Sequence, residues 1–287
     1  MKLLSGKEIK EEIKVGLAER ISSIEEKISL AIIQVGNRED SNAYIAHKKK
    51  FGEEIGAKVS VYTFSERTSE EDVISQIEKL NSDETVHGII LQLPIPEYLD
   101  EKRIIESIDT SKDVDGLTSY NVSLLYKNKK SVVPATARGV LTLLDYYDIA
   151  VQGKNVVVVG RSLLAGKPIA NTLLNRNATV TICHSYTENL DKITKGADIL
   201  IVACGVKHLI KENFVNNKQI VIDVGIHSVI SEKDELEIPG KKYTGDVDFA
   251  EVSKIVSAIT PVPGGIGQLT VACLYENLLD VYFEARN

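Results

Sequence analysis

The stretch VVVVGRSLLAGKPIA, Val156 to Ala170, decides the fold class of this chain. Its run of consecutive valines is typical of a strand in a parallel sheet, which is buried on both faces. A glycine turn follows at Gly160, and a helix is expected from about Lys167. A nucleotide-binding βα unit begins in this way, because the glycine lets a ligand approach the backbone and the helix N-terminus offers free N–H groups to a phosphate.

The turn departs from the usual dinucleotide pattern. Its glycines are Gly160 and Gly166, so the spacing G-x-G-x-x-G is absent. Two glycines would also fit a tight βα turn that holds no ligand, and on these residues alone that alternative stays open.

The end of the next expected strand indicates which nucleotide such a turn would hold. In an NAD site, an acidic residue about 20 positions further on binds the ribose hydroxyls. Here the strand ends in TICHSYT, with His184 and Ser185 at this place and Glu188 as the nearest acid. A carboxylate would repel a 2′-phosphate, whereas Arg161 can offer a planar fork to one. The pattern favours NADP over NAD. Taken singly, Arg161 could instead form a surface ion pair, and His184 could have a structural role at the end of the strand.

Strands and helices alternate along the chain, which predicts an α/β fold with parallel sheets. The expected strands are 30–36, 58–64, 86–94, 155–160, 179–185, 197–204 and 218–225. The expected helices are one that follows the S-x-x-E pattern at Ser5, then 42–57, 69–80, 100–108, one within 133–149, one from about Lys167, and 269–286, with a glycine-rich loop at 260–268. A length of 287 residues fits two domains or one large one.

Composition excludes several classes of protein. The net charge of −7 does not favour nucleic acid as a partner. Cys183, Cys204 and Cys273 are far apart, which favours buried thiols over a disulfide framework or a zinc site, and the histidines show no metal-ligand spacing. The N-terminus becomes charged too early for a signal peptide, and no apolar run approaches the roughly 18 residues of a membrane span. We therefore expect a cytoplasmic protein that holds no metal.

Candidate catalytic residues lie in the first half. Tyr44 and Lys48 are one helical turn apart and share a face of the expected helix. Because this helix follows a strand, that face can look over the carboxyl ends of the strands, where α/β sheets place their sites. A Tyr–Lys pair can carry acid–base chemistry, and the charges of Lys49 and Lys50 would favour the neutral form of Lys48. The alternative is a partly buried tyrosine beside a solvated lysine run.

Two further polar positions stand out. Gln92 lies where an apolar strand ends before Pro94, and a buried amide needs partners, so it is either a turn residue or a site residue. The segment KDVDG, 112–116, contains Asp115 directly before Gly116. This pair fits a turn, and the functional alternative is a carboxylate that anchors a heterocycle rich in hydrogen-bond donors.

A set of motifs identifies a family. These are VGNREDSNAYIAHKKKFGEEIGA, GIILQLPIP, KDVDG, GRSLLAGKP, TVTICHSYT, GDVDF and TPVPGGIG. In this order and spacing, the chain resembles the bifunctional methylenetetrahydrofolate dehydrogenase/methenyltetrahydrofolate cyclohydrolase family over nearly its full length. The resemblance implies oxidation of 5,10-methylenetetrahydrofolate to the methenyl form with NADP⁺, followed by hydrolysis to 10-formyltetrahydrofolate.

The resemblance also implies a domain plan. A folate-binding catalytic domain of residues 1–137 and 258–287 would be completed by the C-terminal helix, and a Rossmann-type NADP-binding domain would span 138–257. The active-site cleft would lie between the two domains, and the protein would be a homodimer through its Rossmann domain.

The resemblance assigns roles to individual positions. Tyr44 would stack on the folate, Lys48 would be the catalytic lysine, Gln92 would bond near it, and Asp115 would grip the pterin. The implied substrate-binding residues are Tyr44, Gln92, Leu93, Pro94, Asp115, Pro261, Val262, Pro263, Gly264 and Gly265. The implied cofactor-binding residues are Gly160, Arg161, Ser162, Gly166, His184, Ser185 and Ile226. No metal is implied.

The chain departs from the family pattern at two places. The family usually has P-C-T-P before the linking helix, where this chain has Ala135 and Ala137, and G-P-M-T after the glycine loop, where it has Gln268 and Leu269. Glutamine in place of proline restores a backbone N–H and frees φ.

Alternative functions remain. Short-chain dehydrogenases also use Tyr-x-x-x-Lys, but in them the nucleotide turn precedes the pair. A shikimate-dehydrogenase-like oxidoreductase would share the domain order without explaining KDVDG and PVPGG together. A dehydrogenase of the same family without cyclohydrolase activity, and a non-catalytic folate- or nucleotide-binding module, also stay open.

Overall fold

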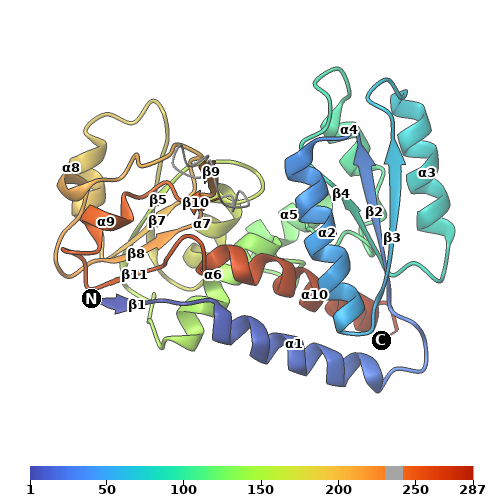
Figure 1. The fold of residues 1–287 in the computed structure, drawn as a ribbon, viewed down its shortest axis with the longest axis horizontal. Helices are drawn as coiled ribbons and strands as arrows, with labels where there is room; N and C mark the ends of the chain where they lie inside the picture. Colours follow the sequence, from blue (N-terminus) through green and yellow to red (C-terminus); the bar gives the residue numbers. More distant parts are fainter. Residues whose placement is uncertain (230–241, 287) are drawn as a thin grey trace, which may run out of the picture. The chain divides into compact units, whose positions relative to one another are not determined.

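The computed structural model describes residues 1–229 and 242–286 (Figure 1). The chain forms two compact units. We name the units after the roles that the family resemblance implies. The nucleotide unit consists of Met1–Lys10 and Thr136–Thr270, and the catalytic unit consists of Glu11–Ala135 and Val271–Asn287. Each unit is built on its own parallel sheet, which confirms the predicted two-domain α/β class.

The catalytic unit has a three-stranded sheet in the order β3-β2-β4. Its strands are β2 (Ser29–Val35), β3 (Lys58–Phe64) and β4 (Gly88–Leu91). Leu30 pairs with Val59 on one side and with Gly88 on the other, so β2 is the central strand. All seven residues of β2 are buried, as expected for a strand covered on both faces.

Helices cover both faces of this sheet. One face, with Ala31 and Ile33, packs on apolar residues of α3 (Glu70–Ser82) and α4 (Glu101–Glu106). On the other face, an added Cβ at Gly88 would touch Leu30 and Leu278 of α10 (Ile266–Glu284). α2 (Glu39–Glu54) runs alongside β3, and α3 lies beside the sheet in Figure 1. The unit also contains α5 (Ser119–Tyr126) and most of α1 (Lys7–Ser22).

The nucleotide unit has a six-stranded parallel sheet in the order β1-β11-β8-β7-β5-β6. The strands are β1 (Lys2–Leu3), β5 (Asn155–Val159), β6 (Thr179–Cys183), β7 (Ile199–Val202), β8 (Ile220–Asp223) and β11 (Ala258–Ile259). Because β5 lies between β6 and β7, the strand order reverses there. In doubly wound sheets, ligands bind outside the carboxyl ends of the strands at this reversal.

The remaining elements of this unit complete its layers. They are α6 (Ala135–Tyr146), α7 (Gly166–Asn175), α8 (Leu190–Lys195), the 3₁₀ turn η1 (Glu212–Phe214), α9 (Phe249–Val252) and an antiparallel pair, β9 (His227–Val229) and β10 (Lys242–Thr244). α7 packs against β5 and β6, while residues of α8, α9 and the segment around η1 join the apolar cluster on Val157, Val159 and Leu200. No helix in the described ranges is both long and apolar enough to cross a membrane.

The differences from the predicted elements are local. α10 begins at Ile266, inside the expected glycine loop, where the Gln268 N–H donates to the carbonyl of Gly265 at 3.1 Å. β4 ends at Leu91, before Pro94, since its pairing with β2 ends there. No element was predicted at α5, α9, the two-residue strands β1 and β11, or the β9–β10 pair, whereas α8 and η1 lie between the strands of 179–225, where some helical segments were expected.

Candidate active site

A lysine, a glutamine and an aspartate form the centre of the candidate site in the catalytic unit. α2 carries Tyr44 and Lys48 one turn apart, and Gln92 follows the end of β4. The Lys48 Nζ donates to the Gln92 Oε1 at 3.1 Å, and the Gln92 Nε2 donates to the Leu93 carbonyl at 2.8 Å. The glutamine is buried, so these two bonds satisfy an amide that would otherwise be costly. They also fix which of its ends faces the lysine.

Asp115 is the charged partner of this lysine. Burial lowers the pKa of Lys48, and the negative charge of Asp115 opposes that shift. Burial raises the pKa of Asp115, which Lys48 counteracts and Asp113 reinforces. The buried environment therefore moves both groups toward their neutral forms, which for Lys48 is the form that accepts a proton.

The expected cause of a neutral Lys48 was wrong. Lys49 and Lys50 are exposed and lie 3.9 Å from carboxylate oxygens of Glu53 and Glu54, and burial is the dominant influence on the Lys48 pKa. Desolvation disfavours an ammonium group more strongly than like charges exposed to water do.

Asp113 organises the loop that presents Asp115. Its buried carboxylate accepts hydrogen bonds from the backbone N–H groups of Gly116 (2.9 Å), Leu117 (3.2 Å) and Thr118 (2.9 Å), and from the side chains of Thr118 (2.7 Å) and Asn121 (2.9 Å). Gly116 has φ +68°, and a Cβ there would lie 2.6 Å from the carbonyl oxygen of Val132. The hydrogen bonds that close this turn are thus accepted by the first acid of KDVDG.

The lysine of the same motif is structural as well. Lys112 Nζ donates to the carbonyls of Leu80 (3.0 Å), Asn81 (2.7 Å) and Asp83 (2.8 Å) at the end of α3. A cation at a helix C-terminus satisfies carbonyls that have no partner within the helix. These roles of Lys112 and Asp113 were not predicted from the sequence, although the motif KDVDG contains both residues.

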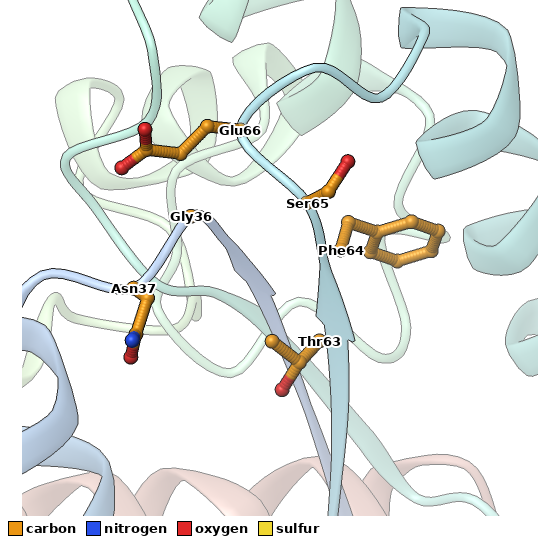
Figure 2. Close-up of a pocket in the computed structure, with 6 residues that line it drawn as sticks. All are labelled: Gly36, Asn37, Thr63, Phe64, Ser65 and Glu66. Atoms are coloured by element: carbon orange, nitrogen blue, oxygen red, sulfur yellow. The ribbon is translucent and has the colours of Figure 1, made fainter.

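Tyr44 is 40% exposed on the helix that carries Lys48. A hollow of about 230 Å³ lies in the same unit at the carboxyl ends of β2 and β3 (Figure 2). Its lining residues are Gly36, Asn37, Thr63, Phe64, Ser65 and Glu66. In Figure 2 the Phe64 ring points away from Gly36. The hollow contains none of Lys48, Gln92 and Asp115, so the catalytic cluster is defined by its contacts rather than by this cavity.

The glycine turn after β5 is tightly packed. Gly160 has φ +122°, and a Cβ there would lie 2.0 Å from the Ala203 carbonyl oxygen; a Cβ at Gly166 would lie 2.2 Å from the Gly160 carbonyl oxygen. The Ser162 Oγ accepts from the N–H groups of Ala165 (3.2 Å) and Gly166 (3.4 Å) at the start of α7. Both glycines are therefore required by the turn itself and by its approach to β7.

The other expected cofactor residues follow neighbouring strands of the same sheet. Arg161 follows β5, with its guanidinium carbon 5.7 Å from the ring centre of Tyr186. His184 and Ser185 follow β6, and the His184 Nδ1 accepts from the Tyr186 N–H at 3.2 Å. Ile226, 45% exposed, follows β8. Since the strands are parallel, all these residues lie at one edge, around the reversal between β5 and β7.

Asp246, a residue of the motif GDVDF for which no role was predicted, connects the loops at this edge. It is fully buried and accepts from the backbone N–H groups of Cys204 (2.8 Å) and Gly205 (2.9 Å), which follow β7. Its other oxygen lies 2.7 Å from the His227 Nε2, after β8. One carboxylate thus holds two of the loops that surround the strand reversal.

A second acid supports this network. Asp223, at the end of β8, accepts from the backbone N–H groups of Gly225 (3.0 Å), Asp246 (3.1 Å) and Val247 (2.9 Å). Burial raises the pKa of Asp223 to about 7 even though these donors favour its charged form. In the sequence, Asp246 stands in the motif GDVDF and Asp223 stands at the end of an expected strand. Their spacing does not indicate that the two residues belong to one network.

The glycine loop Pro261–Gly265 follows β11 and belongs to the nucleotide unit. Gly264 has φ +115° and accepts a hydrogen bond from the Gly6 N–H at 2.8 Å. The predicted catalytic domain began again at residue 258, whereas the compact catalytic unit resumes at Val271. Compactness does not determine which residues bind folate, so that part of the domain plan stays a prediction.

The departures from the family pattern are well accommodated. Ala135 and Ala137 are buried around the start of α6, and Leu269 is fully buried. The N–H that Gln268 has in place of proline is the donor to Gly265 that closes the first turn of α10. Among the described residues, no group of three or more His, Cys, Asp or Glu side chains could hold a metal ion. None of the three cysteines, all of which lie in the described ranges, forms a disulfide; Cys183 and Cys273 are buried, as predicted, and Cys204 is half-buried.

These features define the class: an α/β enzyme with a doubly wound nucleotide-binding unit and a second unit with a half-buried lysine–glutamine–aspartate cluster. The catalytic-domain model of tetrahydrofolate dehydrogenase/cyclohydrolase matches residues 4–115, and the model of its NAD(P)-binding domain matches residues 134–286. The chain belongs to the tetrahydrofolate dehydrogenase/cyclohydrolase family, as the motifs predicted.

Similar proteins agree over the full length. The bifunctional protein FolD of Agathobacter rectalis is 42% identical over 281 residues, which cover 97% of this chain and 98% of that protein. The crystal structure of the bifunctional methylenetetrahydrofolate dehydrogenase/cyclohydrolase from Campylobacter jejuni superposes with a TM-score of 0.93 at 40% identity and 99% coverage of both chains. The Trypanosoma brucei dehydrogenase–cyclohydrolase, solved with NADP cofactor and inhibitor, has a TM-score of 0.93 at 32% identity, with 99% and 98% coverage. The predicted bifunctional enzyme class is thereby confirmed over a shikimate-dehydrogenase-like oxidoreductase.

Proposed function

We propose that this chain oxidises 5,10-methylenetetrahydrofolate to 5,10-methenyltetrahydrofolate with NADP⁺ and hydrolyses the product to 10-formyltetrahydrofolate. The observation that carries the proposal is the contact of 3.1 Å between Lys48 and Gln92 beside Asp115, in a chain that matches bifunctional relatives over 97% of its length. The dehydrogenase step needs a hydride acceptor and the hydrolytic step needs a base, and the chain has a unit suited to each.

NADP fits the edge of the nucleotide unit. We assign the dinucleotide to Gly160, Arg161, Ser162, Gly166, His184, Ser185 and Ile226. Neither His184 nor Ser185, which follow β6, carries a negative charge that would repel a 2′-phosphate. Arg161 offers a guanidinium fork, whose central carbon lies 5.7 Å from the ring centre of Tyr186. When bound, NADP⁺ supplies the acceptor for the hydride. The protein aligns it by holding the loops after β5, β7 and β8, two of them through Asp246.

We assign the folate to Tyr44, Gln92, Leu93, Pro94 and Asp115 of the catalytic unit, together with Pro261, Val262, Pro263, Gly264 and Gly265. Asp115 suits the donor-rich edge of a pterin because the bonds of its turn are accepted by Asp113, which leaves its carboxylate for a ligand. The exposed ring of Tyr44 offers a stacking surface near Lys48.

Lys48 acts in the hydrolytic step. The methenyl carbon is already a cationic electrophile, so attack by water requires only that a proton leave the water oxygen. The neutral amine of Lys48 takes this proton and returns it to the ring nitrogen, which becomes the leaving group. As the carbon–nitrogen bond breaks, the hydroxyl group of the adduct releases its remaining proton to solvent and becomes the carbonyl of the formyl product. Gln92 orients the amine, and Asp115 stabilises the ammonium form that results.

The test is incubation with methylenetetrahydrofolate and NADP⁺, in which NADPH and the methenyl absorbance are followed together. We expect NADPH to form while the methenyl species stays at a low level. Methenyl product equal to NADPH would identify a dehydrogenase without cyclohydrolase activity, and no NADPH would favour a non-catalytic binding module.

We also propose a homodimer through the nucleotide unit. β6 is an edge strand whose Thr181 and Ile182 are exposed, the latter by 41%. An uncovered edge with an apolar side chain is a template for pairing with another strand, and a second copy offers the same edge. Sedimentation of the intact chain should give a dimer, and Ile182→Lys should shift it toward monomer; a monomeric parent protein would contradict the proposal.

A further inference from the structure

The C-terminal helix α10 contacts the helix that carries Lys48. Tyr275 of α10 is fully buried, and its hydroxyl donates to the main-chain carbonyl of Lys48 at 2.7 Å. Its ring stacks on Phe51, with the ring centres 5.5 Å apart. A hydroxyl in an apolar core needs a partner, and here that partner is the backbone of the residue proposed as the base.

This close approach depends on a glycine of α2. A Cβ at Gly52 would lie 2.2 Å from the Tyr275 hydroxyl oxygen and 2.6 Å from a methyl carbon of Val59 on β3. A larger residue would have to displace the tyrosine or the strand. At the turn that follows Lys48, α2 is therefore seated against both β3 and α10.

The same helix holds the loop beside Asp115. Asn277, also buried, donates through its Nδ2 to the carbonyls of Val114 and Val133, each at 2.9 Å. Val114 directly precedes Asp115. α10 thus binds the main chain at Lys48 and next to Asp115, and it provides a common frame for the two charged groups.

We propose that Tyr275 is a positioning residue for the hydrolytic step. Tyr275 fixes the main chain at Lys48, so that the amine stays aligned with Gln92 and the attacking water. The inference rests on the proposed function. A lysine side chain is flexible, with about 2 kcal/mol of rotamer entropy, so the place of its amine depends on a fixed main chain and on its contact with Gln92. A displacement of about 1 Å can lower a rate by about 10²-fold.

The test is Tyr275→Phe in the full-length chain, which removes the hydroxyl and keeps the ring on Phe51. The Lys48 carbonyl keeps its helical partner, so the variant should fold, and circular dichroism and thermal unfolding check this. We expect kcat of the cyclohydrolase to fall roughly 3- to 10-fold, the effect of one hydrogen bond, while kcat of the dehydrogenase and both KM values stay within about twofold. Tyr282→Phe is the matched control, since Tyr282 is a buried tyrosine of the same helix whose hydroxyl lies 3.4 Å from Glu26.

Three results would overturn the inference: an equal fall of both activities, no change in either, or the same change in Tyr282→Phe. A further comparison uses Lys48→Met, in which the tyrosine substitution should cause no additional loss of residual cyclohydrolase activity; an additional loss would mean that Tyr275 acts independently of Lys48. If the parent protein lacks one of the two activities, the proposed function fails instead. If it has both and Tyr275→Phe keeps their ratio, only the positioning role fails.

Discussion

Replacing Lys48 with Met separates the two proposed reactions. Methionine keeps most of the aliphatic stem and removes the amine that donates to Gln92 at 3.1 Å. Hydride transfer needs two aligned molecules and no proton acceptor, whereas hydration of the methenyl cation needs a base. The substitution should therefore affect the second reaction far more than the first.

The expected magnitude follows from the environment of the amine. A positioned general base contributes roughly 10²- to 10⁴-fold, so we expect the cyclohydrolase to lose about that factor while dehydrogenase activity stays measurable. Loss of the bond to Gln92 destabilises the fold, but removal of a polar amine that is partly withdrawn from water relieves its desolvation. Because these effects oppose each other, we expect the free energy of unfolding to change by less than about 2 kcal/mol.

The assay follows NADPH and the methenyl absorbance in the near ultraviolet in one cuvette. In the parent protein, cyclohydrolase kcat should rise with pH as Lys48 loses its proton. Burial lowers the Lys48 pKa, so the rise should be complete below the ordinary lysine value of about 10.4. In Lys48→Met this pH dependence should disappear, and methenyl product should accumulate in step with NADPH.

Lys49→Met is the control, because Lys49 is an exposed neighbour on the same helix and should be dispensable. An equal loss of both reactions with a raised KM for folate would make Lys48 a binding residue and would refute the assignment of the base. Unchanged activities would refute any role of Lys48 in the site.

Three further substitutions test the remaining assignments. Arg161→Ala should raise KM for NADP roughly 10- to 100-fold, the scale of one charge-assisted contact, and leave NAD kinetics almost unchanged; equal use of both cofactors by the parent protein would contradict NADP preference. Asp115→Asn should weaken folate binding without changing NADP binding. Because the charge of Asp115 raises the Lys48 pKa, the substitution should also move the acidic limb of the pH profile of cyclohydrolase kcat to lower pH. Unaltered folate affinity would contradict the anchoring role of Asp115. In Asp113→Asn, an NH₂ group can replace the carboxylate oxygen that accepts three hydrogen bonds, and an NH₂ group cannot accept them. The free energy of unfolding, measured with denaturant, should therefore fall by about 2–5 kcal/mol. A change below about 1 kcal/mol would contradict the organising role of Asp113.

The long elements could be predicted because burial imposes a pattern on them. β2 and β5 read as continuous apolar runs since both faces of their sheets are covered. The missed strands have no such pattern. Lys2 pairs with Ala258, and a two-residue strand that depends on a partner at the other end of the chain leaves no periodic signal. α5 was missed because its residues SYNVSLLY lack a clear apolar period, although Thr118 caps it.

The contacts of the site were predicted unevenly. The one-turn spacing of Tyr44 and Lys48 follows from helix geometry, and the edge at which the cofactor residues gather follows from parallel strands. The partner of the Tyr275 hydroxyl could not be inferred, because a tyrosine in an apolar helix reads as core. The contact with Lys48 is visible only in the structure, where Gly52 leaves room for the Tyr275 hydroxyl to reach the Lys48 carbonyl.

The motif KDVDG shows where spacing stops being informative. Its two acids are two residues apart beside a glycine, and either could close the turn. Asp113 does so because its carboxylate faces N–H groups of the residues that follow, in the manner of an aspartate that caps its own turn. With those donors already satisfied, Asp115 faces Lys48 instead, and each charge offsets part of the desolvation of the other. The chemistry proposed for this chain thus requires different roles for two aspartates, Asp113 and Asp115. Local geometry, rather than residue type, decides which aspartate takes which role.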